Sequence, residues 1–155
     1  MHQISPDGIA FLKEKEGFRN DAYYDSANVL TIGYGHSAYA PSIEQYPVYE
    51  GQHITEEEGE EILRADLKPT EAAVNSAVTR DITQKQYDAL VSFTFNVGVG
   101  AFKASKVLSY TNEGNYQAAG DAFLDYSYAG GEFIPGLRKR REEERAMYLS
   151  SLPQE

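Results

Sequence analysis

The chain has 155 residues, of which 41% are hydrophobic, and it contains no cysteine. This length suits one sizeable core and is short for two domains, and without disulfide bonds the fold must be held by packing. The formal net charge of −10 argues against nucleic acid as a partner, because phosphate binding needs a basic surface. The sequence has neither a bilayer-spanning apolar segment nor a secretory signal peptide. We therefore expect a soluble protein without stable membrane insertion.

The N-terminal part of the chain predicts a helix followed by a β-hairpin. The Ser-Pro pair at residues 5–6 is a helix start, and Gly17 stands where a left-handed helix end is expected. Glu16 therefore falls on the last turn of this helix. Residues 22–36 then carry short aromatic and β-branched runs on either side of a polar turn at residues 25–28, which is the pattern of a hairpin.

The rest of the chain is dominated by helical patterns. Residues 38–51 include two prolines and are expected to be irregular. Capping boxes at residues 55–58 and 83–86 each open a helix. The first of these helices is expected to stop or bend near Leu67, before Pro69, and the second is expected to be buried because it is apolar almost all round. Three further helices are expected, at about residues 104–112, 116–124 and 135–150.

These elements predict an α+β fold that is mainly helical. We expect one domain over residues 1–155, with a small lobe at about residues 18–60 that contains the hairpin. A larger helical lobe would comprise about residues 1–17 and 61–155. A ligand-binding cleft is expected between the two lobes.

Three polar residues follow one another with the spacing E-x8-D-x5-T: Glu16, Asp25 and Thr31. A helix C-terminus disfavours the ionised form of a carboxyl, which suits Glu16 to the role of a general acid. A second carboxylate that activates water and a hydroxyl that orients this water complete a set for hydrolysis of a glycosidic bond. Each residue alone also has a structural explanation, as a helix-end glutamate, a turn aspartate that bonds its own backbone, and a β-forming threonine.

The histidines and glycines do not predict a metal or cofactor. His2, His36 and His53 have no close ligand spacing, so we expect no metal site. We expect His36 to pair with an acidic residue or with the backbone. The Gly-Tyr-Gly segment at residues 33–35 lacks the lysine and helix start of a phosphate-binding loop, and no cofactor is expected.

Residues 138–145 form a run of basic and then acidic residues. Such a run can indicate nucleic-acid binding. Spacings of three and four place opposite charges side by side on a helix, as in Arg138/Glu142 and Glu142/Arg145, and this favours a salt-bridged, solvated helix face. A further hypothesis is that one arginine of this helix reaches Glu16 or a carboxylate of the substrate.

The sequence resembles the phage-type lysozymes, which include the bacteriophage endolysins, and is most similar to their lambdoid branch. The E-x8-D-x5-T spacing matches the catalytic spacing of that family, and residues 31–36 match its T-I-G-x-G-H segment. Further matching segments lie at residues 86–93, 95–102, 128–131 and 135–138. The resemblance extends over about residues 9–149.

The resemblance implies a lysozyme-like fold and a bacteriolytic glycoside hydrolase. This enzyme would be an N-acetylmuramidase that cleaves the β-1,4 bond between N-acetylmuramic acid and N-acetylglucosamine in peptidoglycan, by inversion. Glu16 would be the acid, Asp25 would assist the attacking water, and Thr31 would help to place that water. Contacts with saccharide are implied at Ser37, Phe95 and Ser105.

The same resemblance implies a monomer whose partners are peptidoglycan glycan strands. The enzyme would stay in the host cytoplasm until it is released to the periplasm and cell wall for host lysis. Two alternatives stay open. A lytic transglycosylase needs the acid but no activated water. A noncatalytic wall-binding or structural protein on the same fold is favoured by the net charge of −10, since like charges repel at an anionic wall.

Overall fold

The computed structural model describes residues 2–152, and the chain divides into two compact units. One unit, called the sheet unit below, is Ala10–Pro69. The other, called the helical unit, contains the residues up to Ile9 and those from Thr70 onward. The α+β fold expected from the sequence is confirmed, since helices predominate and the strands form small antiparallel sheets.

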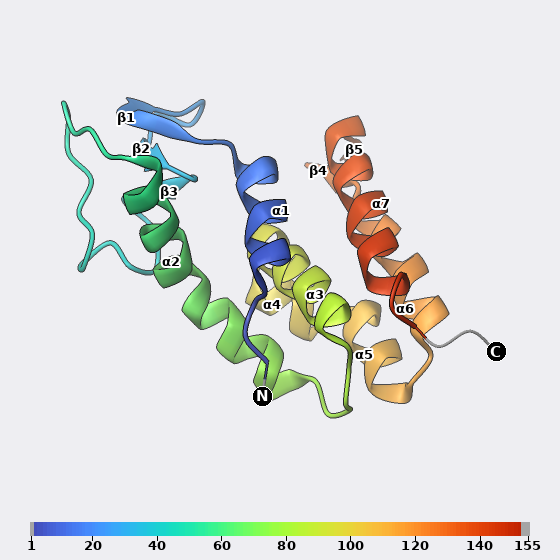
Figure 1. Ribbon diagram of the computed structural model, residues 1–155. Coiled ribbons are helices and arrows are strands. Elements are labelled where there is room, and N and C mark those ends of the chain that lie inside the picture. The colour runs from blue at the N-terminus through green and yellow to red at the C-terminus, as the bar shows by residue number, and fades with distance from the viewer. Residues whose placement is uncertain (1, 153–155) are drawn as a thin grey trace. The chain divides into compact units, whose positions relative to one another are not determined.

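The elements follow the chain in the order that Figure 1 colours them: α1 (Pro6–Glu16), β1 (Arg19–Tyr24), β2 (Leu30–Gly33), β3 (His36–Ser37), α2 (Glu56–Ala77), α3 (Gln84–Val97), α4 (Val99–Lys103), α5 (Lys106–Glu113), α6 (Tyr116–Phe123), the 3-10 turn η1 (Leu124–Tyr126), β4 (Tyr128–Ala129), β5 (Glu132–Phe133) and α7 (Pro135–Leu149). Within the part of the chain from residue 2 to residue 152, no helix combines the length and apolar character needed to cross a bilayer.

The sheet unit contains the antiparallel sheet β1-β2-β3. The predicted hairpin and its polar turn are confirmed, because β1 pairs with β2 in a register that sets Tyr23 opposite Thr31. The expected start of the first strand at Ala22 was too late, since β1 begins at Arg19. The early part of β1 has a partner that the sequence pattern did not reveal: the N–H of Ala22 bonds the carbonyl of Gln52 at 3.0 Å.

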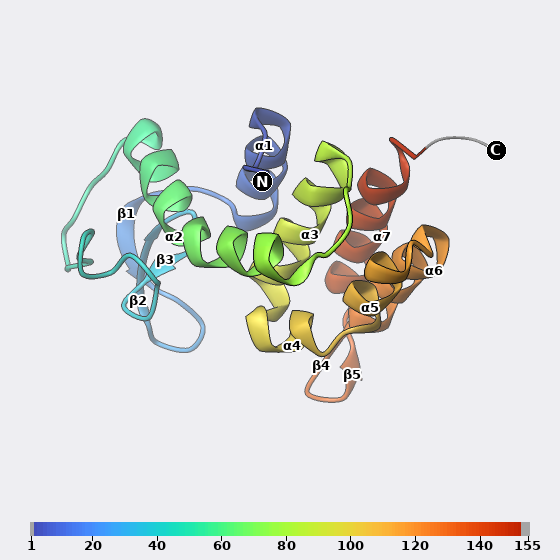
Figure 2. The ribbon, with the colours of Figure 1, turned by 90° about the horizontal axis from the view of Figure 1, so that it is seen from below.

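The sheet packs against the first half of α2 (Figure 2). Ile32, Ile54 and Ile62 form the buried cluster, and Phe18 packs against Tyr34 with ring centroids 5.0 Å apart. The hydroxyl of Tyr34 donates to a carboxylate oxygen of Glu56 at 3.0 Å at the start of α2. Burial and this hydrogen bond raise the pKa of Tyr34 to about 12. The connection between β2 and β3 is therefore fixed to the helix.

The expected end of α2 near Leu67 is wrong, because the helix continues through Pro69 to Ala77. Its predicted capping box is confirmed: the N–H of Glu58 donates to Oγ1 of Thr55 at 3.1 Å, and the N–H of Thr55 donates to the Glu58 carboxylate at 3.0 Å. Proline removes a single backbone donor from a helix. The turns that follow bury Val74 completely, and this packing offsets the lost hydrogen bond.

The helical unit is built around α3, in which every residue from 86 to 94 is buried. The predicted capping box at Thr83 is confirmed, and α3 packs on α7. The expected helices in the next segment are confirmed as α5 and α6, with α5 starting at Lys106 rather than Ala104. The short helix α4 and the β4-β5 hairpin were not expected.

The last helix confirms one part of the charge prediction and corrects another. Arg138 and Glu142 form the expected exposed pair, with Nε 3.6 Å from a carboxylate oxygen. The prediction of a fully solvated face is wrong, because Arg140, Arg141 and Glu144 are buried. These three charged side chains lie on the face that packs on α3, where they bond one another and α3.

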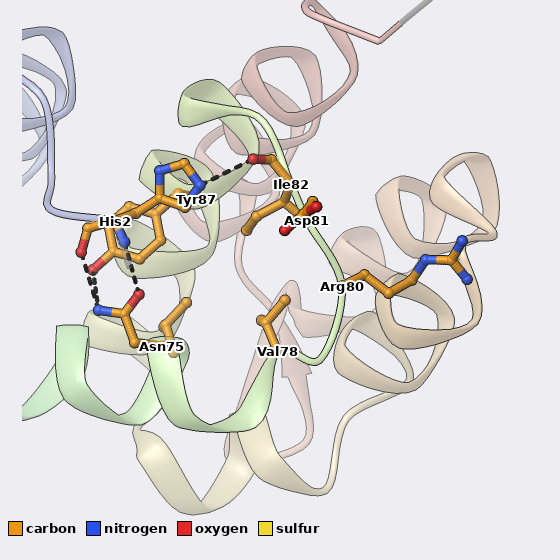
Figure 3. Close-up of a pocket in the computed structure, with 8 residues that line it drawn as sticks. His2, Asn75, Val78, Arg80, Asp81, Ile82 and Tyr87 are labelled. Carbon is orange, nitrogen blue, oxygen red and sulfur yellow. Dashed lines mark hydrogen bonds between the residues drawn. The ribbon is translucent and has the colours of Figure 1, made fainter.

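A pocket of about 290 Å³ lies in the helical unit and contains the start of the chain. Figure 3 shows that its polar groups bond one another: the amide of Asn75 bonds the backbone of His2, and Nε2 of His2 lies 3.0 Å from the carbonyl oxygen of Ile82. The His2 ring stacks on Tyr87 with centroids 5.1 Å apart. The pocket therefore anchors the N-terminal segment on the helices.

The expected pairing of His36 is confirmed within the sheet unit. Its Nδ1 lies 2.8 Å from a carboxylate oxygen of Asp66, and its Nε2 lies 2.6 Å from the carbonyl oxygen of Tyr46. Both partners are acceptors, so both ring nitrogens carry protons and the ring is cationic. Burial alone lowers the pKa of His36, but the hydrogen bonds to Asp66 and Tyr46 outweigh it and raise this pKa above its ordinary value.

We expect this pair to make the protein less stable as the pH rises through the raised pKa of His36. Since the folded-state pKa lies above the unfolded value, the stabilisation is complete below about pH 6.5 and is lost as the folded imidazolium deprotonates. Each unit of elevation contributes ~1.4 kcal/mol. Urea denaturation at a series of pH values should show this slope in the wild type and its loss in His36→Gln.

The matched control for this experiment is His53→Gln. His53 also pairs with an aspartate, since its Nδ1 lies 2.7 Å from Asp21, but the two side chains are 64% and 78% exposed. Exposed pairs contribute little to stability, so this variant should keep the wild-type slope. A His36→Gln protein with an unchanged slope would show that another group titrates.

Candidate active site

Glu16 is the last residue of α1, as the sequence predicted. The helix ends at Gly17, whose φ of 70° lies in the left-handed region and whose N–H bonds the carbonyl of Lys13 at 3.0 Å. Glycine adopts this conformation without steric cost, which makes it a common helix terminator. The helix end therefore holds Glu16 at a defined place at the start of the sheet unit, where it is half-buried.

Gly35 gives the Glu16 carboxyl its space. A Cβ atom on Gly35 would lie 3.4 Å from Oε1 of Glu16, and Gly35 has a φ of 73°. Any other residue here would add both backbone strain and a contact with the carboxyl. The glycine of the T-I-G-x-G-H segment thus brings the connection between β2 and β3 next to the helix-end acid.

Asp25 lies in the turn between β1 and β2, and its carboxylate does two things. Oδ1 accepts the N–H groups of Ala27 and Val29, each at 2.9 Å. This is the turn bonding that the sequence offered as the structural explanation of Asp25. Oδ2 accepts no hydrogen bond from any group between residues 2 and 152. The turn therefore fixes the carboxylate and leaves one oxygen available.

Thr31 is in β2, and its hydroxyl donates to the carbonyl of Val29 at 2.9 Å. The side chain is almost fully buried, at 4% exposure. A hydroxyl has one proton to donate. Because this proton is used, the oxygen of Thr31 acts as an acceptor toward any further partner, such as a water molecule.

Val29 joins these two residues through its backbone. Its N–H binds the carboxylate of Asp25, while its carbonyl accepts both the hydroxyl of Thr31 and the N–H of Asp25, the latter at 3.0 Å. The structure thus brings Asp25 and Thr31 to the two sides of one residue. Sequence reasoning missed Val29, since a backbone role leaves no side-chain signal.

Ser37 lies directly opposite Thr31 in the pairing of β2 with β3. Its hydroxyl accepts the N–H of Tyr39 at 3.1 Å. Residues opposite each other in an antiparallel pair are neighbours on the same face of a sheet. Ser37 therefore belongs to the same local cluster as Thr31.

Phe95 and Ser105 belong to the helical unit. Phe95 is half-buried near the end of α3, directly after the buried run. Ser105 caps α5: its hydroxyl accepts the N–H of Leu108 at 3.1 Å and donates to the carbonyl of Phe102 at 2.7 Å. Ser105 is 4% exposed. The proposed contacts of Phe95 and Ser105 with saccharide stay predictions.

A helix-end glutamate, a turn aspartate and a strand threonine are the residue types of a glycoside hydrolase, and the comparisons agree with this class. The phage lysozyme family model matches residues 13–144. The endolysin of Salmonella phage P22 is 46% identical over 97% of this chain and 100% of its own length. The muramidase domain of SpmX from Asticaccaulis excentricus is 36% identical, with a TM-score of 0.84 over 96% of this chain and 99% of its own.

The chain belongs to the phage lysozyme family, whose members are peptidoglycan-degrading glycoside hydrolases. The endolysin of Bacillus phage B103 is 43% identical over 95% of this chain. The chain spans only 54% of the length of that relative, so the family can carry this unit within longer proteins.

Proposed function

We propose that this lysozyme hydrolyses the β-1,4 bond between N-acetylmuramic acid and N-acetylglucosamine in peptidoglycan, with inversion at the anomeric carbon. Glu16 is the general acid that protonates the leaving oxygen. Asp25 is the base that removes a proton from the attacking water, and Thr31 orients this water. Ser37, Phe95 and Ser105 contact the saccharide.

The observation that carries this proposal is the pairing of Asp25 and Thr31 around Val29. Oδ2 of Asp25 and the hydroxyl oxygen of Thr31 are both acceptors, because the Thr31 proton goes to the carbonyl of Val29. A water that donates one proton to each of these acceptors directs an oxygen lone pair away from both. This lone pair is the nucleophile that an inverting hydrolase needs.

Asp25→Asn tests the assignment of the base. The amide keeps an oxygen that accepts the N–H groups of Ala27 and Val29, so the turn should persist, but the amide cannot take a proton from water. We expect the rate of reducing-end release from purified peptidoglycan to fall about 100-fold, within the range for a general base. NMR of the wild-type products should show the α-anomer first.

Asp21→Asn is the control, because Asp21 is an exposed aspartate of the same hairpin that pairs with His53. It should hydrolyse at the wild-type rate. The rival assignments give other results. Products with 1,6-anhydromuramyl ends would identify a lytic transglycosylase, β-anomers would identify retention, and no release by the wild type would leave a wall-binding protein.

The cellular setting follows from the family. The enzyme acts as a monomer on glycan strands, and it stays in the host cytoplasm until another phage protein permeabilises the inner membrane. Family membership and the endolysin names of its relatives support this setting. Substrate then reaches the protein in the periplasm and cell wall.

A further inference from the structure

A pocket of about 370 Å³ lies within the helical unit, away from the residues assigned above. It is bounded by the end of α3, α4, η1, β4 and α7, and its lining residues are Asn96, Val97, Ala101, Tyr126, Tyr128, Ala129, Leu137 and Arg141. At its rim, Tyr128 packs edge to face on Phe133 at a centroid distance of 5.7 Å, and the two residues are 58% and 50% exposed. The pocket combines aromatic walls with one buried cation.

The buried cation is Arg141, whose side chain is 1% exposed. Its guanidinium has an acceptor on each nitrogen: Nε donates to the carbonyl of Tyr126 at 3.0 Å, Nη1 donates to Glu144, and Nη2 donates to Oδ1 of Asn96. It also lies 5.2 Å from the centroid of the Phe93 ring. Burial lowers the pKa of Arg141, whereas the ion pair with Glu144 favours the charged form. The guanidinium is therefore held on several sides.

This arrangement decides which way the amide of Asn96 faces. A guanidinium can only donate, so the oxygen of Asn96 must face Arg141 and the nitrogen Nδ2 must face away from it. Asn96 is exposed, and Nδ2 donates to no acceptor within residues 2–152. Arg141 thus fixes Asn96 with two free N–H donors at the edge of the pocket.

We propose that Arg141 is a positioning residue that presents Asn96 as a hydrogen-bond donor to an amide carbonyl of peptidoglycan. The inference rests on the proposed function, because it assigns a further part of the same substrate. Amide carbonyls occur in the acetamido groups of the sugars and in the stem peptide, and both are planar groups that suit aromatic walls. Asn96 follows Phe95 on the helix and is rotated from it by about 100°, so it reaches a different part of the ligand.

Asn96→Asp is the sharpest variant. The new carboxylate has nearly the same shape and pairs with the Arg141 guanidinium, but it has no N–H to offer. Binding is measured by calorimetry in the Glu16→Gln background, with soluble peptidoglycan fragments that this background should not degrade. We expect the Kd to rise about tenfold, as for the loss of one hydrogen bond. An unchanged Kd would overturn the inference.

A double-mutant cycle separates positioning from general stability. Arg141→Lys should raise the Kd when Asn96 is present, because a lysine cannot hold the amide in one orientation. In the Asn96→Ala background it should have no further effect on the Kd. An equal effect in both backgrounds would mean that Arg141 acts only on the fold. Arg138→Lys, an exposed change on the same helix, should leave the Kd unchanged.

Two fragment preparations identify the source of the carbonyl. If the effect of Asn96→Asp is present on fragments with stem peptides and absent after an amidase has removed them, the carbonyl belongs to the peptide. If the effect persists, it belongs to an acetamido group. Because binding is read without turnover, a wild type that binds but releases no reducing ends would contradict the proposed hydrolysis and leave the Asn96 result intact.

Discussion

Glu16→Gln is expected to reduce peptidoglycan hydrolysis by about 100- to 10,000-fold, the range that general acid catalysis contributes. The glutamine has the same shape as the glutamate and fits the space beside Gly35, where a Cβ would lie 3.4 Å from the carboxyl. It has no acidic proton to give to the leaving oxygen. The loss should appear in kcat, with little change in KM, because the acid acts in the transition state rather than in binding.

Reducing-end release from purified peptidoglycan measures this loss. Glu14→Gln is the matched control, since Glu14 lies on the same helix with its side chain 76% exposed, and it should keep full activity. Thermal unfolding of both variants should show an intact fold. If Glu16→Gln releases reducing ends as fast as the wild type, Glu16 is not the acid.

Glu144→Gln is expected to cost about 3 to 5 kcal/mol of the free energy of unfolding, the range for breaking a buried ion pair. Glu144 is fully buried and accepts hydrogen bonds from Arg140, Arg141 and the hydroxyl of Ser92. The glutamine removes the charge that both guanidinium groups share, and its NH₂ group meets donors. Since a domain is stable by only about 5 to 15 kcal/mol, this is a large fraction.

Urea denaturation gives the size of this effect, as a lower midpoint at an unchanged slope. Glu142→Gln makes the same chemical change two residues earlier on α7, where the side chain is 59% exposed and pairs with Arg138 at 3.6 Å. That variant should lie within about 1 kcal/mol of the wild type, because exposed pairs contribute little. Equal losses in the two variants would show that burial of Glu144 does not govern its contribution.

Local signals predicted the starts of the helices well. Two capping boxes and the Ser-Pro pair placed the starts of α1, α2 and α3 because each is a set of hydrogen bonds between near neighbours. The end of α2 was missed because it is decided by burial of Val74, which no local rule anticipates. The start of β1 was missed for the same reason, since its partner is Gln52 in the irregular segment.

The catalytic candidates were found by spacing, but their support was not. The sequence placed Asp25 in a turn and Thr31 in the following strand, and both placements are confirmed. It interpreted residues 138–145 as solvated because charges dominate the run. Arg141, Glu144 and Tyr148 nevertheless follow at helical intervals of three and four and are all buried. That periodicity was visible, although the charges concealed it.

The bonding of Val29 explains why this site constrains length more than composition. Only backbone groups of Val29 hold Asp25 and Thr31, so its side chain can change while the bonds persist. Asn28, whose φ is 62°, completes the turn in a conformation that asparagine tolerates. One inserted or deleted residue here would move Asp25 and Thr31 onto different partners. The five residues between them therefore act as a ruler, and loop engineering should vary their identity but conserve their number.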